Sequence, residues 1–264
     1  MRYKTQKSSI TQLGLLGQFL IVFLPFLAIF TAATAAHYLT MHNAELVERE
    51  TGEILNVGLA RSAVVNDLAG VVTDLMFLAD YVQQQGVDKE GNIDDLRVGE
   101  LFRIFAGEKR LYDQLRLLDT TGFEIVRVNY QGGLPNLEDP LYLQNKSDRY
   151  YFREATKLGP GDVYISPLDL NVEYGEIERP FKPMMRFAVS IFDKDGIWRG
   201  VLVLNYLGER LLNSFRRAAG SNLADSVYLL NNDGYWLSSP TAEDNWGFML
   251  PHGRRFSHID PAAW

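Results

Sequence analysis

Arg149 and Arg186 are two cationic side chains of this sequence that could recognise an anion. A guanidinium is planar and donates paired hydrogen bonds, a geometry that fits a carboxylate. For Arg186 an ion pair with Asp169 or Glu173 is an equal alternative, because such a pair would hold a long loop in place. The row Asp169, Asn171 and Glu173 resembles calcium ligands, but it lacks the glycine bend and terminal glutamate of an EF-hand loop. We therefore expect no metal at this row.

The composition excludes several other kinds of chemistry. The 264 residues carry 26 Lys+Arg against 33 Asp+Glu, a net charge of −7 that argues against nucleic-acid binding, because phosphate contacts need a basic surface. The absence of cysteine excludes disulfides, iron–sulfur clusters and thiolate zinc. The four histidines lie near the two ends, and no G-x-S-x-G, H-E-x-x-H or P-loop motif occurs. We expect no cofactor, no nucleic-acid partner and no catalysis in this chain.

An apolar segment from Leu13 to Ala36 is long enough to cross a membrane. At about 1.5 Å per residue, about 20 apolar residues span a hydrocarbon core of about 30 Å. A cleaved signal peptide is the alternative, since the small residues Ala33 and Ala35 suit a peptidase. The apolar core of a signal peptide is typically only about 7–15 residues long, so the sequence favours a membrane anchor.

Charged residues flank the apolar segment unevenly. Three basic residues precede it and three acidic residues follow it: Arg2, Lys4 and Lys7, then Glu45, Glu48 and Glu50. Basic residues stay on the cytoplasmic side of a membrane. We therefore expect the N-terminus inside the cell and the rest of the chain outside the membrane.

A long helix is predicted from residue 37 to 86, where Gly86 is the expected stop. Its second half places apolar residues three or four positions apart, which forms one stripe on a helix: Leu68, Val71, Val72, Leu75, Leu78 and Val82. The helix can pack on the sheet of its own domain or on a second copy of the chain. We expect both, in different halves of the helix.

The middle of the chain alternates with the period of strands and contains several turn signals. Five short antiparallel strands are predicted, at 114–119, 124–130, 163–166, 184–193 and 198–206. Short helices are predicted at 101–109, 148–157 and 208–219. The fold class is α+β, a PAS-like five-stranded sheet with helices at one edge and the long helix behind it.

Another hairpin pattern follows, with strands at 226–231 and 235–237 around the turn Asn232-Asp-Gly234. The sequence stops at Trp264 before further strands appear, and an isolated hairpin is marginal in water. We therefore expect an N-terminal fragment of a longer protein, in which residues 38–219 fold alone and 220–264 stay protease-sensitive. The aromatic side chains of this tail are expected to stay largely exposed: Trp236, Trp246, Phe248 and Phe256.

The stretch Leu143–Leu212 resembles the extracytoplasmic double-Cache, or PDC, sensor domains of bacterial receptors. The resemblance rests on RYYF, VYISPLDLNVE, MMRF and GVLVLNY, while LLNNDGYWLSSP and NWGF resemble the opening of a second module. It implies two stacked PAS-like modules, of which only the membrane-distal one is complete. The implied regions are a cytoplasmic N-terminus (1–12), a transmembrane helix (13–36), a signalling helix (37–86), the distal module (87–220) and an incomplete proximal module (221–264).

The resemblance also implies a ligand pocket. In amino-acid-binding members of the family, an arginine and an aromatic pair hold the ligand carboxylate, and two later acidic residues hold its amine. The matching positions here are Arg149, Tyr151, Phe152 and Tyr164, with Ser166 and Asn205 where the acids would be; Asp169 and Arg186 complete the candidate set. An unpaired ammonium is costly in a desolvated pocket. A free amino acid is therefore a poor fit, and a neutral or anionic small molecule is expected.

The function implied is ligand sensing by a bacterial inner-membrane receptor, most simply a two-component sensor histidine kinase that acts as a homodimer. The alternatives are the sensor of a diguanylate cyclase or chemoreceptor, and a stand-alone anchored solute-binding protein. The coding sequence beyond Trp264 would distinguish them, because a receptor requires a second apolar span followed by an output module.

Overall fold

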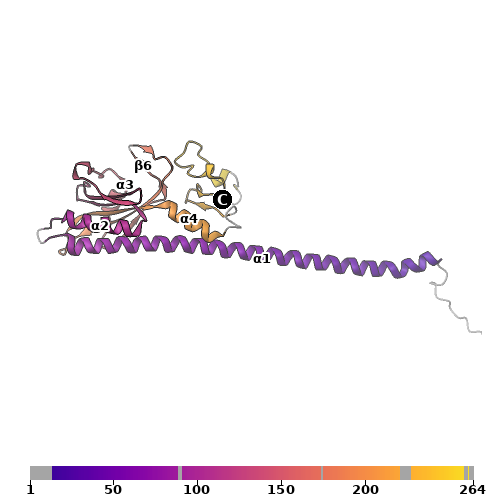
Figure 1. The fold of residues 1–264 in the computed structure, drawn as a ribbon. Helices are drawn as coiled ribbons and strands as arrows, with labels where there is room; N and C mark the ends of the chain where they lie inside the picture. The colour runs from indigo at the N-terminus through magenta and orange to yellow at the C-terminus, as the bar shows by residue number, and fades with distance from the viewer. Residues whose placement is uncertain (1–13, 89–90, 174, 221–226, 259–260, 262–264) are drawn as a thin grey trace, which may run out of the picture. The chain divides into compact units, whose positions relative to one another are not determined.

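The computed structural model describes residues 14–88, 91–173, 175–220, 227–258 and 261. The chain divides into two compact units, Met1–Leu55 and Asn56–Trp264. The boundary falls inside one continuous helix, α1, which runs from Leu15 to Tyr81 and ends in a π-helical turn, Val82–Gly86 (Figure 1). The predicted stop at Gly86 is confirmed.

The first unit contains the apolar start of α1. This stretch is the one candidate membrane span among the described residues, and its side chains are exposed. The hydroxyls of Thr31 and Thr34 donate to the carbonyls of Leu27 and Phe30 at 2.6 and 2.9 Å, so the helix itself satisfies these polar groups. This long apolar helix fits a transmembrane segment. The flanking residues Arg2, Lys4 and Lys7 lie outside the described residues.

The second unit is built on an antiparallel sheet with the strand order β3-β2-β1-β9-β8-β4, and β5 also pairs with β8. The strands are β1 (Tyr112–Leu118), β2 (Glu124–Gln131), β3 (Leu134–Leu137), β4 (Tyr164–Ile165), β5 (Asp169–Leu170), β8 (Pro183–Phe192) and β9 (Trp198–Leu207). The five predicted strands are confirmed. The short strands β3 and β5 were not predicted, because four residues around Pro135 and two residues beside Pro167 have no readable alternation.

Two small ribbons accompany the main sheet. One pairs β6 (Val172–Glu173) with β7 (Glu176–Ile177), and the other pairs β10 (Leu229–Leu230) with β11 (Trp236–Ser238). The second ribbon is the late hairpin predicted from the sequence. Residues 221–226, where its first strand was expected to start, lie outside the described part of the chain.

Three further helices complete the second unit: α2 (Asp95–Lys109), α3 (Tyr150–Ala155) and α4 (Gly208–Ala219). Helix α4 has the predicted bounds. Helix α2 starts six residues before its predicted start at Leu101, because the Asp94 side chain accepts a hydrogen bond from the Arg97 N–H at 3.0 Å and caps the first turn.

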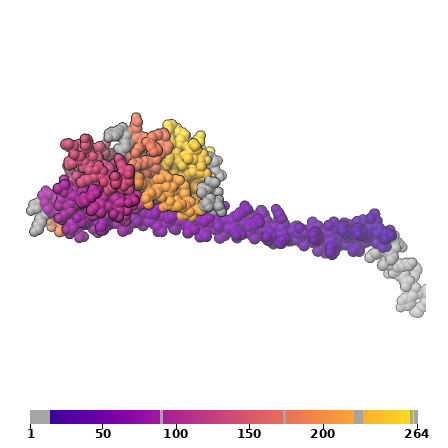
Figure 2. Space-filling model, viewed as in Figure 1, coloured from indigo at the N-terminus to yellow at the C-terminus, as the bar shows by residue number. Residues whose placement is uncertain are grey.

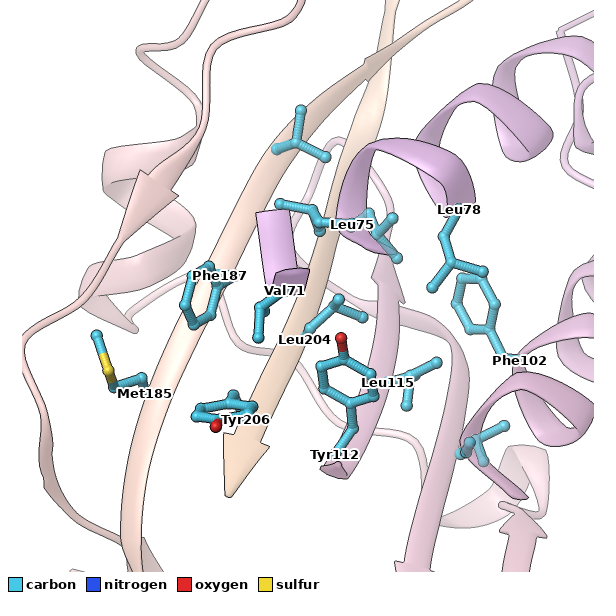
Figure 3. Packing of buried hydrophobic residues seen from close by; sticks show 14 of the residues in the cluster. Val71, Leu75, Leu78, Phe102, Tyr112, Leu115, Met185, Phe187, Leu204 and Tyr206 are labelled. Atoms are coloured by element: carbon cyan, nitrogen blue, oxygen red, sulfur yellow. The ribbon is translucent and has the colours of Figure 1, made fainter. Parts of the chain in front are cut away.

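The apolar stripe of α1 packs on the sheet, as predicted. Figure 3 shows Val71 and Leu75 of α1 beside Leu204 of β9, and Leu78 beside Phe102 of α2. All of these side chains are buried. The same core contains Tyr112 and Leu115 of β1, Met185 and Phe187 of β8, and Tyr206 of β9. Burial of large aliphatic side chains contributes about 1.5–3 kcal/mol each. This packing fixes the second half of α1 against one face of the sheet.

The C-terminal residues also belong to the second unit, and the prediction that their aromatic side chains stay exposed is wrong. Trp236 and Trp246 are only 3% and 5% exposed, and Phe248 and Phe256 are half-buried. Trp246 joins the main core, and the Leu170 N–H contacts the Met249 sulfur at 3.1 Å. In Figure 2 these residues (yellow) are continuous with the surface of the second unit. Leu170 of β5 and the main core supply the apolar partners that the sequence did not reveal.

Candidate ligand-binding site

A cavity of about 190 Å³ lies on the sheet face opposite α1. Four of the eight predicted site residues line it: Arg149, Tyr151, Arg186 and Asn205. The strand register explains this grouping, since Arg186 of β8 is paired with Asn205 of β9 and Asn205 is paired with Gln114 of β1. Neighbours in register point to the same face, and so does Arg116, two positions after Gln114 on β1; three strands therefore present polar side chains at the cavity.

Arg186 is held by partners within the protein. It is 3% exposed, and its guanidinium pairs with the Asp169 carboxylate and donates to the Asn171 side-chain oxygen at 3.0 Å. Burial raises the pKa of Asp169, and the nearby Arg186 partly offsets this rise. The structure therefore contains the ion pair with Asp169 that was the alternative to a ligand contact for Arg186. Asp169 and Asn171 both contact this arginine.

Arg116 lines the same cavity and was not predicted. Its Nη1 donates to the Tyr151 hydroxyl at 3.4 Å and to the Asn205 side-chain oxygen at 3.5 Å. Its Nε lies 3.2 Å from Oε1 of Glu124, which is fully buried and also pairs with Arg127 at 2.8 Å. Glu124 thus holds two buried arginines, one of which reaches the cavity.

Arg149 differs from these two arginines. Its backbone precedes the first turn of α3, and its half-buried side chain lines the cavity. Its guanidinium makes no hydrogen bond or ion pair within the part of the chain that the structure describes. Lys146, Gln144 and Asn171 line the cavity as well.

The other predicted site residues lie outside the cavity lining. Phe152 is buried in a second apolar cluster, against which the half-buried Tyr164 packs. The Ser166 hydroxyl donates to the Pro167 carbonyl and accepts from the Arg186 N–H, both at 2.8 Å. These side chains pack behind the residues that line the cavity and do not line it themselves.

An adjoining cavity of about 250 Å³ shares Arg116, Gln144, Lys146 and Asn171 with the first. Unlike the first, it is also lined by carboxylates: Asp113, Glu138 and Glu178. Asp113 pairs with Lys182 at 2.5 Å, and burial raises the pKa of Asp113 against the effect of that lysine. The cavity beside Arg149 is therefore the cationic end of a longer polar depression.

A sequence signal for the missed arginine exists. Arg116 stands in the middle of the apolar strand β1, where a charged residue needs a buried partner or a ligand. Gln144, Lys146 and Asn171 lie in or beside loops, and only the tertiary structure brings them to the cavity.

A family model described as the bacterial histidine kinase sensor domain matches residues 63–264. The chain belongs to this family. The match covers the whole sheet, the cavity and the C-terminal residues of this sensor domain.

Solved structures agree with this family. The extracellular domain of a protein described as the histidine kinase vpHK1S-Z8 is 26% identical, with a TM-score of 0.62, over 84% of this chain and 80% of that one. A domain of a protein described as a sensory box/GGDEF family member from Vibrio parahaemolyticus is 22% identical, with a TM-score of 0.63, over 81% and 82% of the two chains. No match was found among curated proteins.

Chemoreceptors also share the fold of this sensor domain. The ligand-binding domain of the Campylobacter jejuni chemoreceptor Tlp3, in complex with L-norvaline, is 15% identical, with a TM-score of 0.56, over 74% of this chain and 71% of that one. The predicted PAS-like α+β sensor fold is therefore confirmed, as is the prediction of a sensor function. Only the sensor domain is identified in this chain, and it is a non-catalytic part.

Proposed function

We propose that this sensor domain detects a small anionic molecule, and that Arg149 holds the anion in the cavity between β1, β8, β9 and α3. The observation that supports this proposal is the charge of the lining. Four cationic side chains line the cavity, and no carboxylate lines it within the described residues: Arg116, Lys146, Arg149 and Arg186. A cavity of this sign attracts an anion and disfavours a free ammonium group.

The ion pairs of these cationic side chains indicate which of them can bind the anion. Glu124 and Asp169 neutralise Arg116 and Arg186, so these two arginines mainly shape the site. Arg149 has no such ion pair among the described residues and keeps its guanidinium available for a bidentate contact with a carboxylate. The amino acids bound to the Tlp3 chemoreceptor carry an amine as well, and this cavity offers that amine no counter-charge.

Arg149→Ala is expected to weaken carboxylate binding by about tenfold or more, because a hydrogen bond to a charged group contributes about 1.5–3 kcal/mol. The melting temperature of the ligand-free protein should change little, since Arg149 makes no hydrogen bond or ion pair among the described residues and only a weaker electrostatic interaction with Asp169 would be lost. Calorimetry with a panel of small mono- and dicarboxylates measures the affinity, and a thermal melt measures the stability. Unchanged affinity for the best-binding carboxylate would show that the assignment of Arg149 is wrong.

Arg186→Ala is the matched control. Removal of this arginine leaves Asp169 partly buried without its counter-charge, so the protein should lose about 3 kcal/mol of stability even without ligand. The two arginine variants therefore separate a ligand contact from a structural ion pair.

We also propose the setting of this sensor: the inner membrane of a bacterium, as a homodimer, upstream of a histidine kinase module. The family of the sensor domain and the apolar N-terminal helix support this setting. The distal module at 87–220 and the start of a proximal module at 221–264 belong to the same proposal.

The topology has its own test. An alkaline phosphatase fusion after Ala219 should be active in a bacterial host, because Arg2, Lys4 and Lys7 should keep the N-terminus in the cytoplasm. A fusion at Ser8 serves as the inactive control. A stable but inactive fusion after Ala219 would contradict an exported sensor.

A further inference from the structure

A separate cavity of about 390 Å³ lies between α1, β9 and α4. Tyr206 places it on the sheet face that packs against α1, whereas the neighbouring Asn205 faces the Arg149 cavity. Its volume falls within the range of small-molecule sites. The two cavities share no lining residue, so this one is independent of the function proposed above.

The Tyr206 hydroxyl is the first sign that this cavity binds something. The residue is 2% exposed, lines the cavity and makes no hydrogen bond within the described part of the chain. Burial raises the pKa of Tyr206 to about 12, with Asp67 adding to the rise and Arg210 opposing it. The phenol therefore stays neutral and is a hydrogen-bond donor that lacks an acceptor. Although the residue as a whole is buried, its hydroxyl is open to the cavity, where it can donate to a ligand or to water.

Unpaired charges of both signs line the same cavity. The half-buried Asp67 carboxylate on α1 makes no hydrogen bond or ion pair among the described residues. On α4, Arg210 donates to the Arg110 carbonyl at 3.3 Å and Arg217 donates to the Ser214 hydroxyl at 3.2 Å, and neither forms an ion pair with a carboxylate of the described residues. The deeper carboxylate of Asp74 is different, because Lys109 and the Tyr112 hydroxyl satisfy it, each at 2.6 Å.

We propose that this cavity binds a free α-amino acid, whose ammonium group pairs with Asp67 and whose carboxylate pairs with Arg210 and Arg217. A simple anion would meet the Asp67 carboxylate, and a simple cation would meet the two guanidiniums. A zwitterion satisfies both, and the Tyr206 hydroxyl supplies a further hydrogen bond. The bound molecule would link α1 to α4.

The test uses the full chain in detergent, with Arg149→Ala introduced to weaken the first cavity. Each common amino acid is added at millimolar concentration and followed by thermal shift, and the dissociation constant of the best binder is then measured by calorimetry. We expect at least one amino acid to raise the melting temperature of this variant. Its N-acetyl and methyl ester derivatives should each bind at least about tenfold more weakly, since each lacks one charge.

Single substitutions then locate the site. Asp67→Asn and Arg217→Gln should each raise the dissociation constant about tenfold or more, and Tyr206→Phe should raise it about fivefold. Asp80→Asn, an exposed position of α1 outside the cavity, is the matched control and should leave it unchanged. Because Asp67 makes no hydrogen bond or ion pair in the part of the chain that the structure describes, its replacement should not change the melting temperature of the ligand-free protein. The proposal is overturned if no amino acid binds, or if the best binder is insensitive to Asp67→Asn.

Discussion

Replacing Glu124 with glutamine is expected to lower the free energy of unfolding by about 3–5 kcal/mol, the typical loss when one member of a buried charge cluster is removed. The Glu124 carboxylate is fully buried and lies 3.2 Å from Arg116 and 2.8 Å from Arg127. It also accepts a hydrogen bond from the Gln144 N–H at 3.0 Å. Glutamine keeps the shape but not the charge, so Arg116 would stay buried without this counter-ion, and Arg127 would keep its ion pair with Glu138 and its hydrogen bond to the Tyr142 carbonyl.

Urea unfolding of residues 56–264, the second compact unit, measures this loss. Glu154→Gln is the matched control, because Glu154 pairs with Lys157 at the surface and such pairs contribute only about 0–1 kcal/mol. The Glu124 variant should also bind carboxylates differently, since Arg116 lines the cavity beside Arg149. Equal, small losses in the two variants would mean that the buried cluster does not stabilise the fold.

Trp246→Ala is expected to destabilise the second unit by about 3–5 kcal/mol, the range for removal of a large buried aromatic side chain. The indole joins the main core and lies 6.2 Å from the ring of Phe248. The Trp246 N–H donates to the Trp236 carbonyl at 2.9 Å, so its amide should also exchange slowly with solvent. Both results follow from docking of the C-terminal residues on the sensor sheet.

Urea unfolding and hydrogen exchange of residues 56–264 measure the two effects. Tyr228→Ala, at a side chain that is about half exposed, is the control from the same segment and should cost less than about 1 kcal/mol. If Trp246→Ala costs no more than this control and its amide exchanges rapidly, the C-terminal residues do not dock in solution.

The fold could be predicted from the sequence to the extent that local patterns carry it. The strands β8 and β9, the stripe of α1 and the turn at Gly196 were predicted from residues close together in the chain, and the structure contains all three. The family match confirms the sensor fold that these patterns and the resemblance predicted. The short strands β3 and β5 were not predicted, because a segment of two to four residues forms a strand only through its pairing with a neighbouring strand.

Only four of the eight site residues predicted from the sequence line the cavity. Arg149 and Asn205 were found by resemblance, and both line the cavity. Arg116 was missed because its neighbours in space, Tyr151 and Asn205, lie 35 and 89 residues away in the sequence. For the same reason the sequence could not decide whether Arg186 binds a ligand or pairs with Asp169.

The sequence by itself determined the apolar N-terminal helix, five of the strands of the sensor sheet and the absence of thiol chemistry, because length, period and composition are properties of the chain alone. The tertiary structure decided which charges are neutralised and which are available. It pairs Arg186 with Asp169 and Arg116 with Glu124, leaves Arg149 facing a cavity, and buries Trp246 in the core. These outcomes depend on distances between residues far apart in sequence, and only the packing of the sheet, helices and C-terminal residues fixes such distances.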